Sequence, residues 1–191
     1  IILNKLNLLS NSQIEKIVDS IPELHSFYED NCKKNQYAYK IAKDIYGGLI
    51  IIYGTSLTDP IVSRFRSQIA ENAKLLASHH ILPELNHNAV VGYQSPQQME
   101  GKFFVLLLSS SLKHPSTAVN YRVTEELLDK AGIGFRTVEA PGYGPLGQMF
   151  GSVLIGDFAS YYLAILQGID PSPVEVIKYF KGQFDKWRNS G

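Results

Sequence analysis

A cluster of polar residues separates two apolar stretches in the segment ILPELNHNAVV. Glu84, Asn86, His87 and Asn88 all belong to this cluster. Imidazole titrates near neutral pH, so a histidine placed here is suited to moving protons between oxygen atoms. Polar groups at this density, in a chain that must return to the core, favour a functional site. A capped loop in which the two asparagines satisfy backbone groups is the alternative.

Glu71 and Asn72 lie upstream, in a helix that we predict from Pro60 to Ser78. Helical periodicity places Asn72 on the same side as Phe65, so its amide faces the packed side and needs a hydrogen-bond partner. Glu71 points away from that side, and periodicity alone interprets it as a solvated surface residue.

Two loops rich in hydroxyl groups follow predicted strands. The first contains Gly54, Thr55 and Ser56 at the start of a helix, where free backbone amides and the helix dipole favour a phosphate. We take these three residues and Asn72 as candidate substrate-binding residues. A tight turn that needs Gly54 for close packing is the alternative. The second loop, SSSLKHPST, has anion-binding groups as well, and helix capping by Ser116 is its simpler explanation.

The sequence contains no ligand pattern typical of a metal centre. His79 and His80 are adjacent, and further ligands at metal-binding spacing are missing, so we interpret the pair as residues of a helix end. Cys32 is the single cysteine, which excludes an intramolecular disulfide and a cysteine-based zinc site. We therefore expect no metal, and a reducing, cytoplasmic location fits the cysteine content.

The composition is typical of one globular domain and excludes several classes of protein. The chain has 191 residues, 45% of them hydrophobic, and 18 basic residues balance 18 acidic ones. Zero net charge argues against binding to nucleic acid or to a membrane surface, since both need a positive field. The apolar runs are too short to span a bilayer, and the N-terminus lacks the basic region and cleavage site of a signal peptide.

The order of predicted elements indicates an α/β fold. Residues 1–46 read as a helical lead-in, with Ser12 as the cap of its first helix. Buried strands are predicted at residues 49–53 and 103–108, and an alternating, less buried strand at 135–139. Helices are predicted at 60–78, 116–131 and 146–166, with a last helix after Pro171 and Pro173. Strands that alternate with helices favour a doubly wound parallel sheet flanked by helices. Ligands bind at the carboxyl ends of such strands, here residues 54–59, 109–115 and 140–144.

Several stretches resemble the bifunctional phosphoglucose/phosphomannose isomerases, in the second of their two sugar-isomerase (SIS) domains. The most specific are QIAENAK and LPELNHNAVVGY, and IIIYGTSLTDPIVSRFRSQ and DFASYYLAILQGIDPSPVEVIKYFK agree with them. The resemblance covers about residues 48–181. It implies that residues 47–191 form an SIS domain, the second domain of a two-domain enzyme.

The resemblance also implies roles for particular residues in aldose–ketose isomerisation. By motif, Glu71 matches the family's glutamate and His87 its histidine, while Lys181 matches an assisting lysine, with Lys178 as the rival. The histidine is thought to serve the neighbouring subunit, which implies a homodimer. Glu71 would act as the base through a cis-enediol if a dry cleft raises its pKa. The reaction moves only protons, so no cofactor is expected.

Two features depart from the family pattern. The family's phosphate is held mainly by a loop of its first SIS domain, and the arginine near the intermediate has no match here. The missing initiator Met favours a C-terminal part of a longer enzyme, and we expect the isolated chain to isomerise poorly. A sugar-phosphate-binding SIS module without catalysis and a structural dimerisation domain are the alternatives.

Overall fold

The computed structural model describes residues 5, 10–29, 36–94, 101, 103–139 and 144–189. Its centre is a four-stranded sheet in the order β2-β1-β3-β4, in which every neighbouring pair is parallel. The predicted α/β class is therefore confirmed. The strands are β1 (Leu49–Thr55), β2 (Ala77–Leu82), β3 (Phe103–Ser109) and β4 (Gly134–Glu139).

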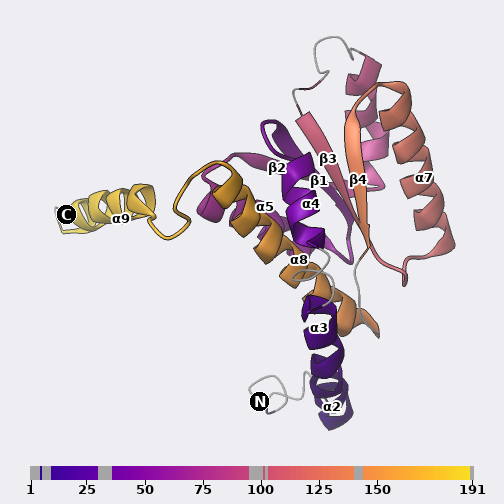
Figure 1. Ribbon diagram of the computed structural model, residues 1–191, viewed down its shortest axis with the longest axis horizontal. Coiled ribbons are helices and arrows are strands. Elements are labelled where there is room, and N and C mark those ends of the chain that lie inside the picture. Colours follow the sequence, from indigo (N-terminus) through magenta and orange to yellow (C-terminus); the bar gives the residue numbers. More distant parts are fainter. Residues whose placement is uncertain are drawn as a thin grey trace.

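Helices cover both faces of this sheet, as a doubly wound fold requires (Figure 1). One face packs against α4 (Tyr37–Asp44), α5 (Asp59–Ala73) and α8 (Gly144–Leu166). The other face is covered by α7 (Pro115–Lys130) and by two 3₁₀ turns, η2 (Glu84–His87) and η3 (Ala89–Gln94). Buried strands with apolar side chains on both faces explain the continuous apolar runs of β1 and β3.

The helix α4 belongs to the main hydrophobic core. Ala38, Ile41 and Ala42 are completely buried against α8 and the sheet. An ion pair between Asp44 at the end of α4 and Arg136 of β4 attaches the helix to this edge strand of the sheet. This part of the helical lead-in is thus packed as tightly as the elements that follow it.

The helix α8 is long and apolar. It has the length and composition of a membrane-crossing helix, but its buried side packs against α4 and α5. Small residues allow this close packing: a Cβ on Gly156 would lie 2.9 Å from the ring of Phe65. We attribute its apolar character to its place between two helices in the core.

The strand β2 was not predicted, and the expected helix from residue 60 to 78 is wrong beyond Ala73. Lys74 has a left-handed backbone (φ 57°), which ends α5, and the chain then returns along β1 as an edge strand. Ile50 pairs with Ala77 at the start of the two strands, and Thr55 pairs with Leu82 at their ends. His79 and His80 therefore lie on a strand rather than at a helix end.

Two predicted caps are also corrected. In α2 (Asn11–Asp19) the capping residue is Ser10 rather than Ser12, because Ser10 and Gln13 exchange backbone-to-side-chain hydrogen bonds of 2.8 and 3.3 Å. In α7 the cap is His114, whose Nδ1 accepts a hydrogen bond from the amide of Ser116. A second short helix, α3 (Ile21–Phe27), follows α2.

The last helix, α9 (Glu175–Arg188), lies apart from the rest of the molecule (Figure 1). None of its residues is buried, although Val176, Phe180 and Phe184 repeat at helical spacing and form an apolar stripe. Val176 is 81% exposed. The rest of the described chain leaves this stripe open to solvent.

Candidate functional site

Glu71 lies in the last turn of α5, at the edge of the sheet where the strands begin. Its side chain is exposed, as periodicity predicted. The neighbouring Lys74 donates hydrogen bonds to the carbonyl oxygens of Glu71 and Pro171, the latter at 3.1 Å. The end of α5 is thereby attached to the segment that leads from α8 to α9.

This segment also carries an acidic group that interacts with Lys74. Asp170 accepts a hydrogen bond of 2.8 Å from the amide of Ser172. The pKa of Asp170 is lowered, mainly by its hydrogen bonds with Ser172 and to a lesser extent by the charge of Lys74. Lys74 therefore links the end of α5 to this segment by its charge as well as by its hydrogen bonds.

His87 lies in η2, directly after the end of β2. Leu85 is buried and anchors this turn, while the imidazole of His87 is exposed. The asparagines have structural roles: Asn86 Oδ1 accepts from Thr124 Oγ1 at 3.1 Å, and Asn88 Oδ1 accepts from its neighbour's amide. His87 is left without a hydrogen-bond partner among the described residues, which is the property of a group available to a ligand.

One copy of the chain does not bring Glu71 and His87 together. Glu71 precedes β2 and His87 follows it, so the two side chains lie at opposite edges of the sheet. The six residues of β2 alone span about 20 Å at about 3.3 Å per residue. Glu71 and His87 of the same copy therefore cannot both contact one small molecule.

The two candidate lysines lie on α9, away from both edges of the sheet. Lys178 Nζ is held by Glu175 Oε1 at 2.7 Å within the same helix. Lys181 is exposed, and no ion pair or hydrogen bond holds its side chain within the described chain. Lys181 is therefore the less constrained of the two lysines.

The loop after β1 forms a tight turn. Thr58 Oγ1 accepts from the Thr55 amide at 2.8 Å and donates to the Thr55 carbonyl at 3.2 Å, and the Thr58 side chain makes no capping hydrogen bond to α5. Gly54 is buried beneath this turn, where a Cβ would lie 2.5 Å from Val62. Close packing accounts for Gly54, whereas the side chain of Ser56 is exposed at the carboxyl edge.

Asn72 is directed at the packed side of α5. Its Nδ2 donates to Ser160 Oγ of α8 at 2.8 Å and to Gln68 Oε1 at 3.2 Å. The partner that the sequence required is therefore a serine in the core. No described contact of Asn72 reaches the turn formed by Thr55 and Ser56.

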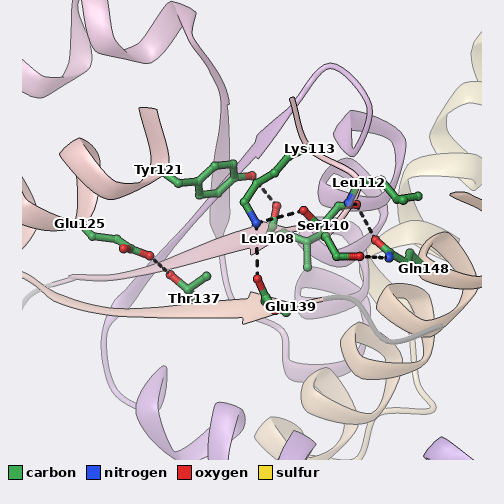
Figure 2. Close-up of polar contacts among 10 residues, drawn as sticks. Leu108, Ser110, Leu112, Lys113, Tyr121, Glu125, Thr137, Glu139 and Gln148 are labelled. Atoms are coloured by element: carbon green, nitrogen blue, oxygen red, sulfur yellow. Dashed lines mark hydrogen bonds and ion pairs between the residues drawn. The ribbon is translucent and has the colours of Figure 1, made fainter. Parts of the chain in front are cut away.

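A polar network beyond β3 was missed by sequence reasoning (Figure 2). Ser110 Oγ donates to Gln148 Oε1 at 2.5 Å, and Lys113 Nζ donates to the Ser110 carbonyl at 3.1 Å. Tyr121 donates to the Leu108 carbonyl at 2.6 Å. The loop SSSLKHPST pointed to a polar site here. Its partner Gln148, however, lies within the apolar helix α8, and the sequence does not indicate which side of that helix faces the loop.

Burial changes the acidity of three tyrosines on this side of the sheet. The pKa of Tyr121 is raised by desolvation and by the charge of Glu125. Tyr53 and Tyr93 share a hydrogen bond of 2.6 Å between their hydroxyl groups, and burial raises the pKa of both. All three are neutral at physiological pH and act as hydrogen-bonding groups.

Within the described ranges, no group of three or more His, Cys, Asp or Glu side chains is arranged to hold a metal ion. His79 instead lies 3.5 Å from Asp59 at the start of α5. Cys32 and residues 140–143 of the third predicted ligand loop fall outside the described residues.

The chain is similar to several proteins with known or assigned names. A model of the bacterial phospho-glucose isomerase C-terminal SIS domain matches residues 34–184. Bifunctional phosphoglucose/phosphomannose isomerases are 32% identical in Caldicellulosiruptor bescii, over 94% of this chain and 54% of the relative, and 33% identical in Aquifex aeolicus, over 83% and 51%. The chain thus spans about half the length of these curated relatives.

A solved structure agrees with the fold. The glucose-6-phosphate isomerase like protein from Thermus thermophilus has a TM-score of 0.62 and 21% identity, with 84% of this chain and 52% of that chain covered. At this identity, the likeness concerns the arrangement of strands and helices.

Proposed function

The chain belongs to the family of bacterial phospho-glucose isomerase C-terminal SIS domains, and on that basis we propose that it supplies the second half of a sugar-phosphate isomerase. Its substrates would be glucose 6-phosphate and mannose 6-phosphate, each interconverted with fructose 6-phosphate. The observation that carries the proposal is the match to relatives named for these activities, over a range that includes Glu71 and His87. The non-catalytic binding module is the alternative.

In the proposed reaction, His87 first moves a proton between the anomeric hydroxyl and the ring oxygen, which opens the sugar ring. Lys181 assists as a donor to the ring oxygen. Glu71 then removes the C2 proton, the electrons of that C–H bond form the C1–C2 double bond, and the carbonyl oxygen gains a proton. Return of this proton from Glu71 to C1 of the cis-enediol, with loss of the proton from the C2 hydroxyl as the C2 carbonyl forms, gives the ketose. Glucose and mannose 6-phosphates differ only at C2, so one enediol serves both.

We propose that two copies of the chain share these groups. Both side chains are exposed and point to solvent at opposite edges of one sheet. In a twofold dimer, the Glu71 edge of one copy faces the His87 edge of its partner, and symmetry creates the same site twice. Such an interface also supplies the cover that excludes water from the carboxylate.

The lysine and the phosphate-binding group of the proposed site would be supplied through contacts with a second domain or subunit. Docking of α9 against a second domain or subunit would carry Lys181 to the substrate and bury the apolar stripe of that helix. A further SIS domain, which the greater length of the relatives provides for, would hold the phosphate. A cytoplasmic location suits an enzyme of sugar phosphates.

The catalytic assignment is tested by Glu71→Gln in the full-length protein, with turnover of fructose 6-phosphate as the readout. Loss of a general base lowers kcat by about 10²–10⁴-fold, while substrate binding survives because glutamine has nearly the same shape. Asp129→Asn, a surface carboxylate on α7, is the matched control and should leave kcat unchanged. Unaltered turnover in Glu71→Gln would remove Glu71 from the mechanism.

Sharing between subunits is tested by mixing Glu71→Gln with His87→Ala after each is inactive alone. Random reassociation makes half of the dimers hybrid, and each hybrid contains one intact site, so about a quarter of the wild-type activity returns. If each subunit used its own Glu71 and His87, no intact site would form. A mixture that stays inactive, although mass spectrometry shows hybrid dimers, contradicts the shared site.

A further inference from the structure

We propose that Thr124, a buried residue of α7, is a positioning residue for His87. This inference rests on the proposed function, in which His87 moves the proton that opens the sugar ring. Thr124 is completely buried, so it acts through a neighbour of His87. That neighbour is Asn86, whose Oδ1 accepts a hydrogen bond from Thr124 Oγ1 at 3.1 Å.

The 3₁₀ turn η2 is too short to fix the direction of His87 by itself. It has four residues, and hydrogen bonds in 3₁₀ turns have poorer geometry than those of α-helices. Around His87, the Asn86 amide donates to the Pro83 carbonyl at 2.9 Å and the Asn88 amide to the Leu85 carbonyl at 3.3 Å. The direction of the imidazole therefore depends on the side chains that attach this turn to the rest of the fold.

Two residues before His87 attach the turn in different ways. Leu85 is 1% exposed and packs into the apolar cluster that β1, β3 and α7 share. Such packing is non-directional, so it fixes the depth of the turn but leaves the turn free to rotate. The hydrogen bond between Asn86 and Thr124 is directional, because its strength falls steeply as its angle decreases. Thr124 therefore fixes the rotation of the turn that carries His87.

Thr124 itself is held in one position on α7. It lies between Tyr121 and Leu128 at helical spacing, and all three residues are buried. Its Oγ1 also donates to the carbonyl of Asn120, one turn earlier in the helix, at 2.7 Å. Threonine has two common rotamers in a helix, and a bond of this kind selects one of them. The hydroxyl that holds Asn86 is thus a fixed point of the scaffold.

The stability of the fold gives little reason for a hydroxyl at this position. Thr124 has apolar neighbours, and valine has nearly the same shape without a polar group. The bond to Asn120 satisfies the hydroxyl within its own helix, whereas the bond to Asn86 reaches another element. Asn86 is half-buried, so its side chain can turn to water when it loses this partner. We therefore expect the hydroxyl to matter more for the direction of His87 than for stability.

A second hydrogen bond limits the motion to η2. Tyr93 of η3 and Tyr53 of β1 share a bond of 2.6 Å between their hydroxyl groups. Tyr93 lies six residues beyond His87, so it restrains the later part of the segment rather than the turn itself. Loss of the bond from Thr124 should therefore free the turn to rotate without releasing the segment from the sheet.

The proposal is tested by two opposite substitutions of Thr124 in the full-length protein, with turnover of fructose 6-phosphate and urea unfolding as readouts. Thr124→Val removes the hydroxyl and keeps the shape, so the urea midpoint should stay near the wild-type value. Its kcat should fall by about tenfold or more, because a displacement of about 1 Å can cost 10²-fold. Its KM should change little. Thr124→Ser keeps the hydroxyl but loses a buried methyl group, so stability should fall while kcat stays near the wild-type value.

Ser152→Ala is the matched control for loss of a buried hydroxyl. Ser152 Oγ donates to the Gln148 carbonyl one turn earlier in α8 at 2.8 Å, and no described hydrogen bond joins it to η2. Its kcat should equal that of the wild type. Unchanged kcat in Thr124→Val would refute the positioning role, and so would an equal loss of kcat in Thr124→Ser.

Measurements without substrate separate this inference from the proposed function. In ¹⁵N relaxation of the chain, the order parameter of the His87 amide should be near the rigid value of about 0.85. It should fall in Thr124→Val but not in Ser152→Ala. An equally rigid His87 amide in Thr124→Val would overturn the positioning role, whatever the turnover. Full turnover in His87→Ala would instead contradict the proposed function, and the order parameters would still show whether Thr124 holds the turn.

Discussion

Gly54→Ala tests how closely α5 packs on the central strand. An added Cβ would lie 2.5 Å from Val62 Cγ2 and 2.6 Å from Thr58 Oγ1. Non-bonded atoms in ordinary contact are about 3.5–4.0 Å apart, so each contact is about 1 Å too short. Val62 is completely buried and Thr58 nearly so, which leaves neither side chain room to move away.

The size of the effect follows from this geometry. Relief of the overlap requires α5 to shift from β1, and overpacking of this kind costs about 1–3 kcal/mol. The shift also weakens the hydrogen bonds of Thr58 with Thr55, worth about 1 kcal/mol. Alanine regains about 0.5–1 kcal/mol through the lower entropy of its unfolded chain. The free energy of unfolding should therefore fall by about 1–3 kcal/mol.

Urea unfolding followed by far-UV circular dichroism measures this loss, and the thermal midpoint should drop by about 2–4 °C per kcal/mol. Gly182→Ala on α9 is the matched control, because its Cβ would meet no atom within 4 Å. It should leave the unfolding of the sheet unchanged. A Gly54→Ala protein that unfolds at the wild-type urea midpoint would refute the packing explanation of this glycine.

Two further substitutions test other parts of the described structure. The pKa of Tyr121 is raised in the folded state, so folding favours its neutral form. Its contribution to the free energy of unfolding is fully present below about pH 10, where tyrosine ionises in the unfolded chain. Above that pH the free energy of unfolding falls by up to about 1.4 kcal/mol per pH unit. Tyr121→Phe should flatten this alkaline decline in urea titrations, and an unchanged slope contradicts the assignment. Asn72→Ala loses the hydrogen bond to Ser160 and should cost about 1 kcal/mol by the same method; a fall in turnover without a fall in stability would instead indicate a substrate contact.

Three of the four strands could be predicted, two of them because they are buried apolar runs and the third, at residues 135–139, because its residues alternate in polarity. Residues 49–53, 103–108 and 135–139 all lie within observed strands. Burial on both faces requires apolar side chains at every position, and this pattern is visible in a single sequence.

The missing strand shows where such reasoning fails. Residues 77–82 contain two histidines and occupy an edge of the sheet, so they lack the apolar run of a central strand. The turn before them uses Lys74 in a left-handed conformation rather than the glycine that usually marks a helix end. Tertiary pairing with β1 decided the structure here, and local preference did not.

The candidate site could be predicted by residue type but not by geometry. The motif around His87 is recognisable, and exposure of Glu71 follows from periodicity. Their placement at opposite edges depends on β2, which carries the chain from one edge of the sheet to the other. Without that strand, the distance between the two groups cannot be deduced from their separation in sequence.

The isolated position of α9 also provides an optical signal. Trp187 is the only tryptophan of the sequence, and it is 72% exposed near the end of this helix. A helix of 14 residues with no buried side chain is marginally stable in water. The fluorescence emission of Trp187, excited selectively, therefore reports on the surroundings of α9, and a shift to shorter wavelength indicates that the C-terminal helix has become buried against another surface.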